Sequence, residues 1–231
     1  MRGTFWGDFM STNYVIVGGG DFAIEVATYL IDIWQMIEGD APLVTDIVAR
    51  GRIRLDEFST VLGSPPSIHE DIVSIENLPE KVSIIAVGDP RLRYQFMREI
   101  KASGGRLGTV IHPTAYVAST ATIGEGTIIC PMAFVGPFAS VGRNCAINVH
   151  AVVGHDVVLG DCAVMSPGSD VNGHGCVGEG GFLGAGAIIS PKASLGAFGK
   201  LSAGSVLNRV TDEGFLMHGN PAAGRQMFRR P

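Results

Sequence analysis

Hydrophobic residues recur at every sixth position through the second half of the chain. Counting in sixes from Ile111 to Leu207 gives seventeen positions, and each of them holds an aliphatic residue or methionine. A period of six fits neither an α-helix nor a strand with simple alternation. The pattern predicts a parallel β-helix in which each coil has three short strands and about 18 residues, with the aliphatic side chains pointing inward.

Small residues accompany this repeat. The residue two places before each aliphatic position, from Ala115 to Ser205, is Ala, Thr, Cys, Val, Ser or Gly. Such residues suit the narrow interior of a β-helix. Glycine often follows the aliphatic position, and we expect it to give the corners unusual backbone angles. A single coil buries little surface, so stability has to come from stacking on the neighbouring coils.

The first hundred residues follow a different pattern. Short apolar runs typical of buried strands occupy residues 14–17, 42–48 and 82–87. Amphipathic helical spacing occupies residues 21–35 and about 91–103. Strands that alternate with helices predict a small, Rossmann-like parallel sheet.

This change of pattern divides the chain into four segments. They are an N-terminal extension (1–12), a small α/β domain (13–107), the β-helix (108–209) and a C-terminal segment (210–231). The extension has no apolar core and is not a secretory signal; Met10 is an alternative natural start. No apolar run reaches the roughly 18 to 20 residues of a membrane span.

Composition excludes some functions. The net charge is -5 and there is no basic run, which argues against a nucleic-acid partner. The four cysteines form no C-x-x-C pair and show no disulfide spacing. We therefore expect reduced cysteines and a cytoplasmic protein.

A glycine turn follows the first predicted strand. Residues 18–23, GGGDFA, match G-x-G-x-x-A, a pattern that brings backbone amides and a helix N-terminus to a phosphate group. The α/β domain is half the size that a dinucleotide needs, so a nucleotide or nucleotide sugar is the better ligand. A plain strand-to-helix turn is the alternative. The predicted nucleotide-sugar contacts are Gly18, Gly19, Gly20, Asp21, Phe22, Asp46, Gly88 and Asp89.

The two halves together resemble the NeuD/PglD-like sugar acetyltransferases, which are hexapeptide-repeat acyltransferases. The resemblance covers about residues 14 to 228, and its markers are VIVGGGDFAIEV, AVGDPRLR, IHPTAYV, NVHAVVGHDVVLGD and HGNPA. It implies a left-handed β-helix, a homotrimer with active sites between subunits, acetyl-CoA as cosubstrate and no metal. The family often continues its glycine turn as Gly-His-Gly, where this chain has Asp21-Phe22-Ala23.

The resemblance implies an N-acetyltransferase of surface glycan biosynthesis. Its substrate would be a nucleotide-linked amino sugar of the 4-amino-4,6-dideoxy type, because a nucleotide-sized cradle suits an activated sugar. One alternative is O-acetylation of a sugar hydroxyl, as in the sialic acid O-acetyltransferases. A second is a trimeric solenoid without catalytic activity.

Two histidines and an aspartate interrupt the repeat at AINVHAVVGHDVVLGD (146–161). Val153 and Gly154 take the wall and corner positions, so His155 and Asp156 follow the corner and can face outward. The resemblance implies that His155 is the general base and Asp156 the carboxylate that orients it. Gly173 lies 18 residues after His155, one coil along, and matches the amide that the family uses for the acetyl oxygen.

Coenzyme contacts follow from the same resemblance. The pantetheine arm of coenzyme A would meet the backbone at small residues. The C-terminal segment would lie on the coenzyme side, with its Gly219–Ala222 turn near the adenine end of coenzyme A. The predicted coenzyme A-binding residues are His174, Ala185, Ala203, Gly204, Asn220, Pro221 and Arg225. A solvated surface role is the alternative for His150 and His174.

A zinc enzyme of the γ-class carbonic anhydrase type is the remaining rival. That class also has a His-x4-His pair, which His150 and His155 provide here. Its third ligand lies two coils, or about 36 residues, before the first histidine. Thr114 occupies that position and His112 is out of register, so the spacing argues against a metal.

Overall fold

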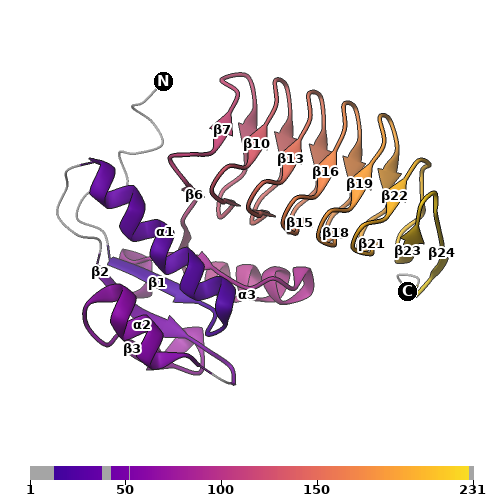
Figure 1. Cartoon of the computed structure of the whole chain (residues 1–231). Coiled ribbons are helices and arrows are strands. Elements are labelled where there is room, and N and C mark those ends of the chain that lie inside the picture. Colours follow the sequence, from indigo (N-terminus) through magenta and orange to yellow (C-terminus); the bar gives the residue numbers. More distant parts are fainter. Residues whose placement is uncertain (1–12, 38–42, 52, 229–231) are drawn as a thin grey trace. The chain divides into compact units, whose positions relative to one another are not determined.

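The computed structural model describes residues 13–37, 43–51 and 53–228. The predicted extension, residues 1–12, lies outside them. Contacts divide the chain into two compact units (Figure 1): residues 1–88 with 95–110, called the α/β unit, and residues 89–94 with 111–231, called the solenoid unit. None of the helices in the described part of the chain has the length and apolar character needed to cross a membrane.

The α/β unit is built on a five-stranded parallel sheet with the strand order β3-β2-β1-β4-β5. The central strand β1 carries Tyr14 to Val17, all fully buried, which explains its place in the middle of the sheet. The strands are β1 (Asn13–Val17), β2 (Leu43–Val48), β3 (Ser67–His69), β4 (Val82–Ile85) and β5 (Arg106–Leu107). The helices are α1 (Asp21–Ile37), α2 (Leu55–Leu62) and α3 (Pro90–Ala102), with 3₁₀ turns at Ile72–Ser74 and Leu78–Glu80.

The solenoid unit contains seventeen two-residue strands, β6 to β22, that begin six residues apart. They form three parallel faces (Figure 1). The first face comprises β6 (Val110–Ile111), β9 (Ile128–Ile129), β12 (Ala146–Ile147), β15 (Val164–Met165), β18 (Phe182–Leu183) and β21 (Lys200–Leu201), followed by β23 (Phe215–Gly219) and β24 (Ala222–Gln226). The second face comprises β7 (Tyr116–Val117), β10 (Phe134–Val135), β13 (Val152–Val153), β16 (Asp170–Val171), β19 (Ile188–Ile189) and β22 (Val206–Leu207). The third face comprises β8 (Thr122–Ile123), β11 (Ser140–Val141), β14 (Val158–Leu159), β17 (Cys176–Val177) and β20 (Ser194–Leu195).

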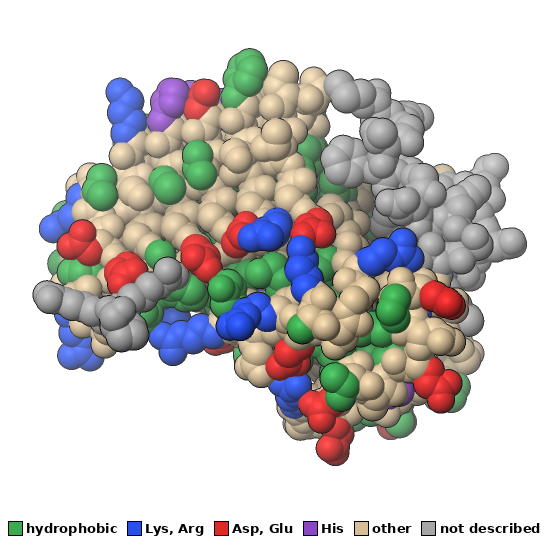
Figure 2. All heavy atoms as spheres, turned by 180° about the vertical axis from the view of Figure 1, so that it is seen from behind, with side chains coloured by type: hydrophobic (Ala, Val, Ile, Leu, Met, Phe, Trp, Pro, Cys, Tyr) green, Lys and Arg blue, Asp and Glu red, His purple; other side chains and the backbone are tan. Residues whose placement is uncertain are grey.

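The sixfold repeat is therefore confirmed as a parallel β-helix. Partners on neighbouring coils are 18 residues apart, as Val153 and Val171 are. The aliphatic residues and the small residues before them form one interior cluster that includes Ile129, Ala133 and Val135. Much of the solenoid surface in Figure 2 consists of backbone and uncharged side chains.

The glycines after the aliphatic positions have a different role from the predicted one. Gly124, Gly154 and Gly160 do not have positive φ; the left-handed residues stand two places later, as Asp156 does. A Cβ at any of these three corner glycines would come within 3.0 Å of the backbone of the next coil. The prediction of unusual backbone angles at these glycines was thus wrong. Glycine is needed there because adjacent coils approach too closely for a side chain.

We expect Gly160→Ala to lower the free energy of unfolding by about 1–3 kcal/mol, the usual cost of overpacking. The new Cβ would clash with the amide nitrogen of Glu179 and lie 2.8 Å from the carbonyl carbon of Gly178. Urea unfolding measures the change. Gly168→Asn is the control, because Gly168 has open space around it and a positive φ that asparagine tolerates. Equal losses in the two variants would contradict the close-approach explanation.

The first turn of α3 belongs to the solenoid unit. Arg93 is fully buried; its Nε donates to the Asn144 carbonyl oxygen at 2.7 Å and its Nη2 to Asn144 Oδ1 at 2.7 Å. The Asn144 amide donates in return to the Arg93 carbonyl at 2.9 Å. Burial lowers the pKa of Arg93 to about 10, which still leaves it charged at neutral pH. The sequence pattern predicted this helix without revealing that contact.

Candidate active site

His155 and Asp156 lie at the corner between the second and third faces, directly after β13. The Gly154 amide donates to the Val171 carbonyl at 2.8 Å, and the Asp156 amide donates to the Pro137 carbonyl at 3.0 Å. These bonds hold the turn to the coils on both sides. Asp156 has φ of 57°, a left-handed conformation that aspartate tolerates better than most residues. The backbone of the corner is therefore hydrogen-bonded to both neighbouring coils, and its side chains face outward, as predicted.

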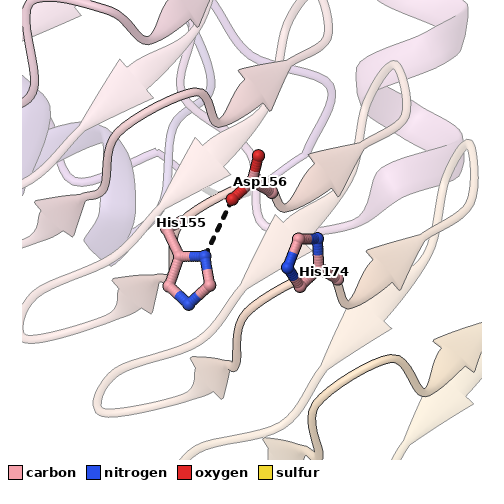
Figure 3. Close-up of side chains that lie close together, drawn as sticks. All are labelled: His155, Asp156 and His174. Atoms are coloured by element: carbon pink, nitrogen blue, oxygen red, sulfur yellow. Dashed lines mark hydrogen bonds and ion pairs between the residues drawn. The ribbon is translucent and has the colours of Figure 1, made fainter.

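His155 and Asp156 form a hydrogen-bonded pair (Figure 3). The distance between His155 Nδ1 and Asp156 Oδ2 is 2.8 Å. An ionised carboxylate only accepts hydrogen bonds, so Nδ1 carries the proton and donates it. The lone pair of the neutral ring then lies on Nε2. The His155 side chain is 58% exposed and that of Asp156 is 41% exposed, so a substrate can reach both.

Gly173 lies against the free nitrogen of this ring. A Cβ on Gly173 would overlap His155 Nε2 and lie 2.6 Å from His155 Cε1. The backbone N–H of Gly173 donates to no other residue in the described part of the chain. The structure thus brings together the three groups that the sequence pointed to: an imidazole, its carboxylate and an uncommitted amide.

His174 joins the same corner, one coil beyond Asp156. Its ring meets the ring of His155 edge to face, with centroids 5.2 Å apart and an interplanar angle of 90°. Its backbone N–H donates to the His155 carbonyl at 3.1 Å. Figure 3 shows the two rings and the carboxylate side by side. By contrast, His150 is exposed at the corner between the first and second faces, and His112 is bonded to Thr114.

The predicted pantetheine contacts lie at a different corner. Ala185, Ala203 and Gly204 are exposed between the first and second faces, and the Gly204 amide donates to the Ala185 carbonyl at 2.9 Å. The width of the second face separates them from His155 and Gly173 within one chain. One chain does not bring the predicted base and the predicted coenzyme wall together.

The predicted adenine-end residues lie on the hairpin of β23 and β24. Asn220 and Pro221 form its turn and are exposed. Arg225 lines a surface pocket of about 400 Å³ together with Leu216, His218 and Gly224. Sequence reasoning missed His218. Strand alternation could have found it, because His218 and Leu216 are two residues apart on one strand and share a face.

The glycine turn of the α/β unit joins β1 to α1. Gly18 has φ of 145°, and a Cβ there would collide with the carbonyl oxygen of Ala86, so this glycine has a packing role. Gly20 is exposed, and no atom lies within 4 Å of where its Cβ would be. Gly19 and Phe22 are half-buried. The turn leaves space for a ligand at Gly20.

Sequence reasoning missed Arg54 beside this turn. Its backbone N–H donates to the Gly19 carbonyl at 3.3 Å, and its guanidinium is paired with Asp21 and Glu57. It therefore places a guanidinium next to the predicted phosphate site, with its charge balanced by the carboxylates of Asp21 and Glu57. Gly88 is exposed after β4, while the Asp89 carboxylate accepts from the Arg91 and Leu92 amides and caps α3.

Asp46 is buried among polar side chains and is not open to a ligand. It is 5% exposed, and its carboxylate accepts from Lys81 Nζ at 2.6 Å, from His69 Nε2 at 2.8 Å and from the Thr45 hydroxyl. Burial by itself raises the pKa of Asp46, but the hydrogen bonds from Lys81, Thr45 and His69 outweigh it, so the pKa lies below its ordinary value. Because these partners occupy its oxygens, the predicted role of Asp46 in substrate binding has no geometric support.

We expect Lys81→Met to lower the free energy of unfolding at pH 7 by about 3–5 kcal/mol, because it leaves a buried carboxylate without its cation. The lowered pKa of Asp46 contributes stability that is present above the unfolded-state pKa of about 3.9 and is lost as the pH falls through the folded-state pKa. The difference in free energy of unfolding between wild type and Lys81→Met should therefore become smaller below about pH 4. Urea unfolding against pH measures it, with the exposed Lys101→Met as control. A gap that does not change with pH would contradict this account.

The fold is shared with solved structures of sugar acetyltransferases. PerB from Caulobacter crescentus, solved with CoA and GDP-perosamine, is 30% identical, with a TM-score of 0.78 over 92% of this chain and 97% of PerB. The acetyltransferase domain of PglB from Neisseria gonorrhoeae, solved with acetyl coenzyme A, is 25% identical, with a TM-score of 0.77 over 93% of this chain and 100% of that domain. WeeI from Acinetobacter baumannii is 20% identical, with a TM-score of 0.74 over 93% and 100%, and shows likeness of fold alone. A scan against protein-family models and a search of curated proteins found no match.

A β-helix of hexapeptide repeats with a histidine–carboxylate pair at its corner defines the chain as a hexapeptide-repeat acyltransferase. The chain is 30% identical in sequence to PerB over 92% of its own length, and this similarity shows the family. The chain belongs to the NeuD/PglD-like sugar N-acetyltransferases. The perosamine N-acetyltransferase has also been solved with one histidine replaced by asparagine or alanine, each time with CoA and GDP-perosamine.

Proposed function

We propose that the protein transfers the acetyl group of acetyl-CoA to the amino group of a nucleotide-linked amino sugar. The observation that carries this proposal is the contact between His155 Nε2 and Gly173, with Asp156 on the opposite ring nitrogen. The likeness to PerB, which holds CoA and GDP-perosamine, favours an amine over a sialic acid hydroxyl as acceptor. A GDP-linked 4-amino sugar is thus the first substrate to test.

His155 acts as general base and then as general acid. The sugar amine attacks the thioester carbonyl carbon, a carbon–nitrogen bond forms, and His155 Nε2 takes the amine proton. The Gly173 N–H stabilises the negative charge on the carbonyl oxygen of the tetrahedral intermediate. The carbon–sulfur bond then breaks, and the imidazolium returns the proton to the departing thiolate. Asp156 stabilises that imidazolium and fixes the tautomer that accepts the proton.

The proposal requires more than one copy of the chain. Ala203 and His155 lie at different corners of one chain, with the second face between them, so one chain does not form a single groove that holds both. A neighbouring copy would supply the missing wall. The second face carries suitable apolar surface: Tyr116 is 55% and Phe134 38% exposed, and their rings stack with centroids 5.0 Å apart. We therefore propose a homotrimer with left-handed coils, as the family resemblance implies; light scattering that gives the mass of one chain would contradict it.

The α/β unit would hold the nucleotide. Gly20 leaves open space at the N-terminus of α1, and Arg54 adds a guanidinium beside it. Backbone amides at a helix N-terminus suit a diphosphate, and Arg54 could add a charge-assisted hydrogen bond by exchanging Asp21 for a phosphate oxygen. Gly88 lies after β4, the strand paired with β1, and so belongs to the same edge of the sheet. The cysteine spacing, with no C-x-x-C pair, favours the expected cytoplasmic location. A role in surface glycan synthesis fits an activated amino sugar.

The test is acetyl-CoA turnover against a panel of GDP-, UDP- and dTDP-linked 4-amino sugars and free sialic acids. Thiol release measures the rate, and mass spectrometry of the product identifies the acetamide. Matched nucleotide sugars with a hydroxyl in place of the amine are the control. We expect turnover of at least one nucleotide-linked amine and none of its hydroxyl counterpart. Turnover of free sialic acids alone would contradict the proposal.

A further inference from the structure

Two imidazoles and one carboxylate meet at the catalytic corner. One ring nitrogen of His155, one of His174 and one carboxylate oxygen of Asp156 all lie within 4.8 Å of one another (Figure 3). Among the described residues, these three side chains form the one group of histidine, cysteine or acidic residues whose spacing could hold a metal ion. It differs from the His150–His155 pair, for which the sequence spacing argued against a metal, because His174 and Asp156 are brought together by stacking of coils.

We propose that His155, Asp156 and His174 form a binding site for a divalent transition-metal ion, with Zn²⁺ as the best-suited ion. Neutral imidazole nitrogen and carboxylate oxygen are the ligands that Zn²⁺ and Co²⁺ accept together, whereas Mg²⁺ and Ca²⁺ prefer oxygen alone. Three protein ligands leave one tetrahedral position open for water or another ligand.

The geometry is close to what such an ion needs. Metal–ligand distances of about 2.0–2.2 Å place tetrahedral ligands roughly 3.3 Å apart. The three donor atoms must therefore approach one another by up to about 1.5 Å. The three side chains are exposed, so rotation about their own bonds can close that gap. The backbone beneath them is already fixed, because β13 pairs with β16 and the His174 amide donates to the His155 carbonyl.

Metal binding would block acetyl transfer, a consequence that rests on the proposed function. A metal ion bound by His155 occupies a ring nitrogen and prevents the ring from accepting a proton from the sugar amine. The site would therefore act as an inhibitory one. The binding itself does not depend on which sugar the enzyme uses.

Co²⁺ titration followed by visible absorption tests the site directly, on the full chain without an affinity tag. We expect ligand-field bands that grow with Co²⁺ and are displaced by Zn²⁺. His174→Asn and His155→Asn should each raise the dissociation constant at least about 10-fold, since loss of even an outer partner of a metal ligand can cost that much. His150→Asn, an exposed histidine at a left-handed position like that of His174, is the matched control and should leave it unchanged.

The outcomes separate the two proposals. Absence of the bands in wild type, or bands that persist unchanged in His174→Asn, would overturn the metal site. Bands with the expected variant pattern, on a protein that acetylates no sugar in the panel, would support the metal site and count against the proposed function. In an active preparation, Zn²⁺ should inhibit thiol release and EDTA should restore it; transfer at full rate by the Zn²⁺-loaded protein would contradict the inhibitory role.

Discussion

His155→Ala is expected to lower kcat by roughly 10²–10⁴-fold, the range that a positioned general base contributes. Without this imidazole, the site loses the ring nitrogen that lies beside Gly173 and accepts the amine proton. The Gly173 amide and the binding contacts remain, so some transfer should persist above the uncatalysed rate. Thiol release at saturating acetyl-CoA and sugar nucleotide measures kcat.

The same variant should fold and assemble normally. The His155 side chain is 58% exposed and makes no contribution to the solenoid interior, so the free energy of unfolding should change by less than about 0.5 kcal/mol. His150→Asn is the activity control, because this exposed histidine lies at another corner. A His155→Ala protein with wild-type kcat would contradict His155 as the general base and require another group to accept the amine proton.

The solenoid could be predicted because every coil repeats the same constraint. The residues at every sixth position from Ile111 to Leu207 face one narrow interior. The sixfold period is therefore visible in the sequence and gives an 18-residue register between coils. That register also placed Gly173 against His155 without any coordinates. The function of the corner glycines could not be predicted the same way. A glycine selected for positive φ and one selected for close approach look identical in a sequence, and only the backbone distances distinguish them.

The α/β unit was less predictable because its small elements leave weak patterns. Helix α2 buries only Phe58 fully, and β3 and β5 have no buried residue. The partners of Asp46 were also hidden, since Lys81 and His69 are 35 and 23 residues away and no repeat relates them. A buried carboxylate at the end of an apolar run resembles a ligand site until its ion pair is seen. The same holds for Arg54, which reaches the glycine turn from a separate segment.

Gly173→Ala is expected to lower kcat by about 10²-fold, although the substitution adds only a methyl group. The new Cβ would overlap His155 Nε2, so the ring has to move from its place beside the amide. A displacement of about 1 Å at a reacting group can cost this much in rate. Gly173 does not have positive φ, so alanine fits its backbone, and the free energy of unfolding should change little.

A double-variant cycle isolates the contact between the methyl group and the ring. In a His155→Ala background there is no ring to displace, so adding Gly173→Ala should change kcat less than about threefold, whereas it costs about 10²-fold when the ring is present. Non-additivity of that size is the result expected if Gly173 acts by giving Nε2 its place. If Gly173→Ala costs the same factor in both backgrounds, the glycine acts through the coenzyme or the oxyanion alone, and the ring does not depend on it.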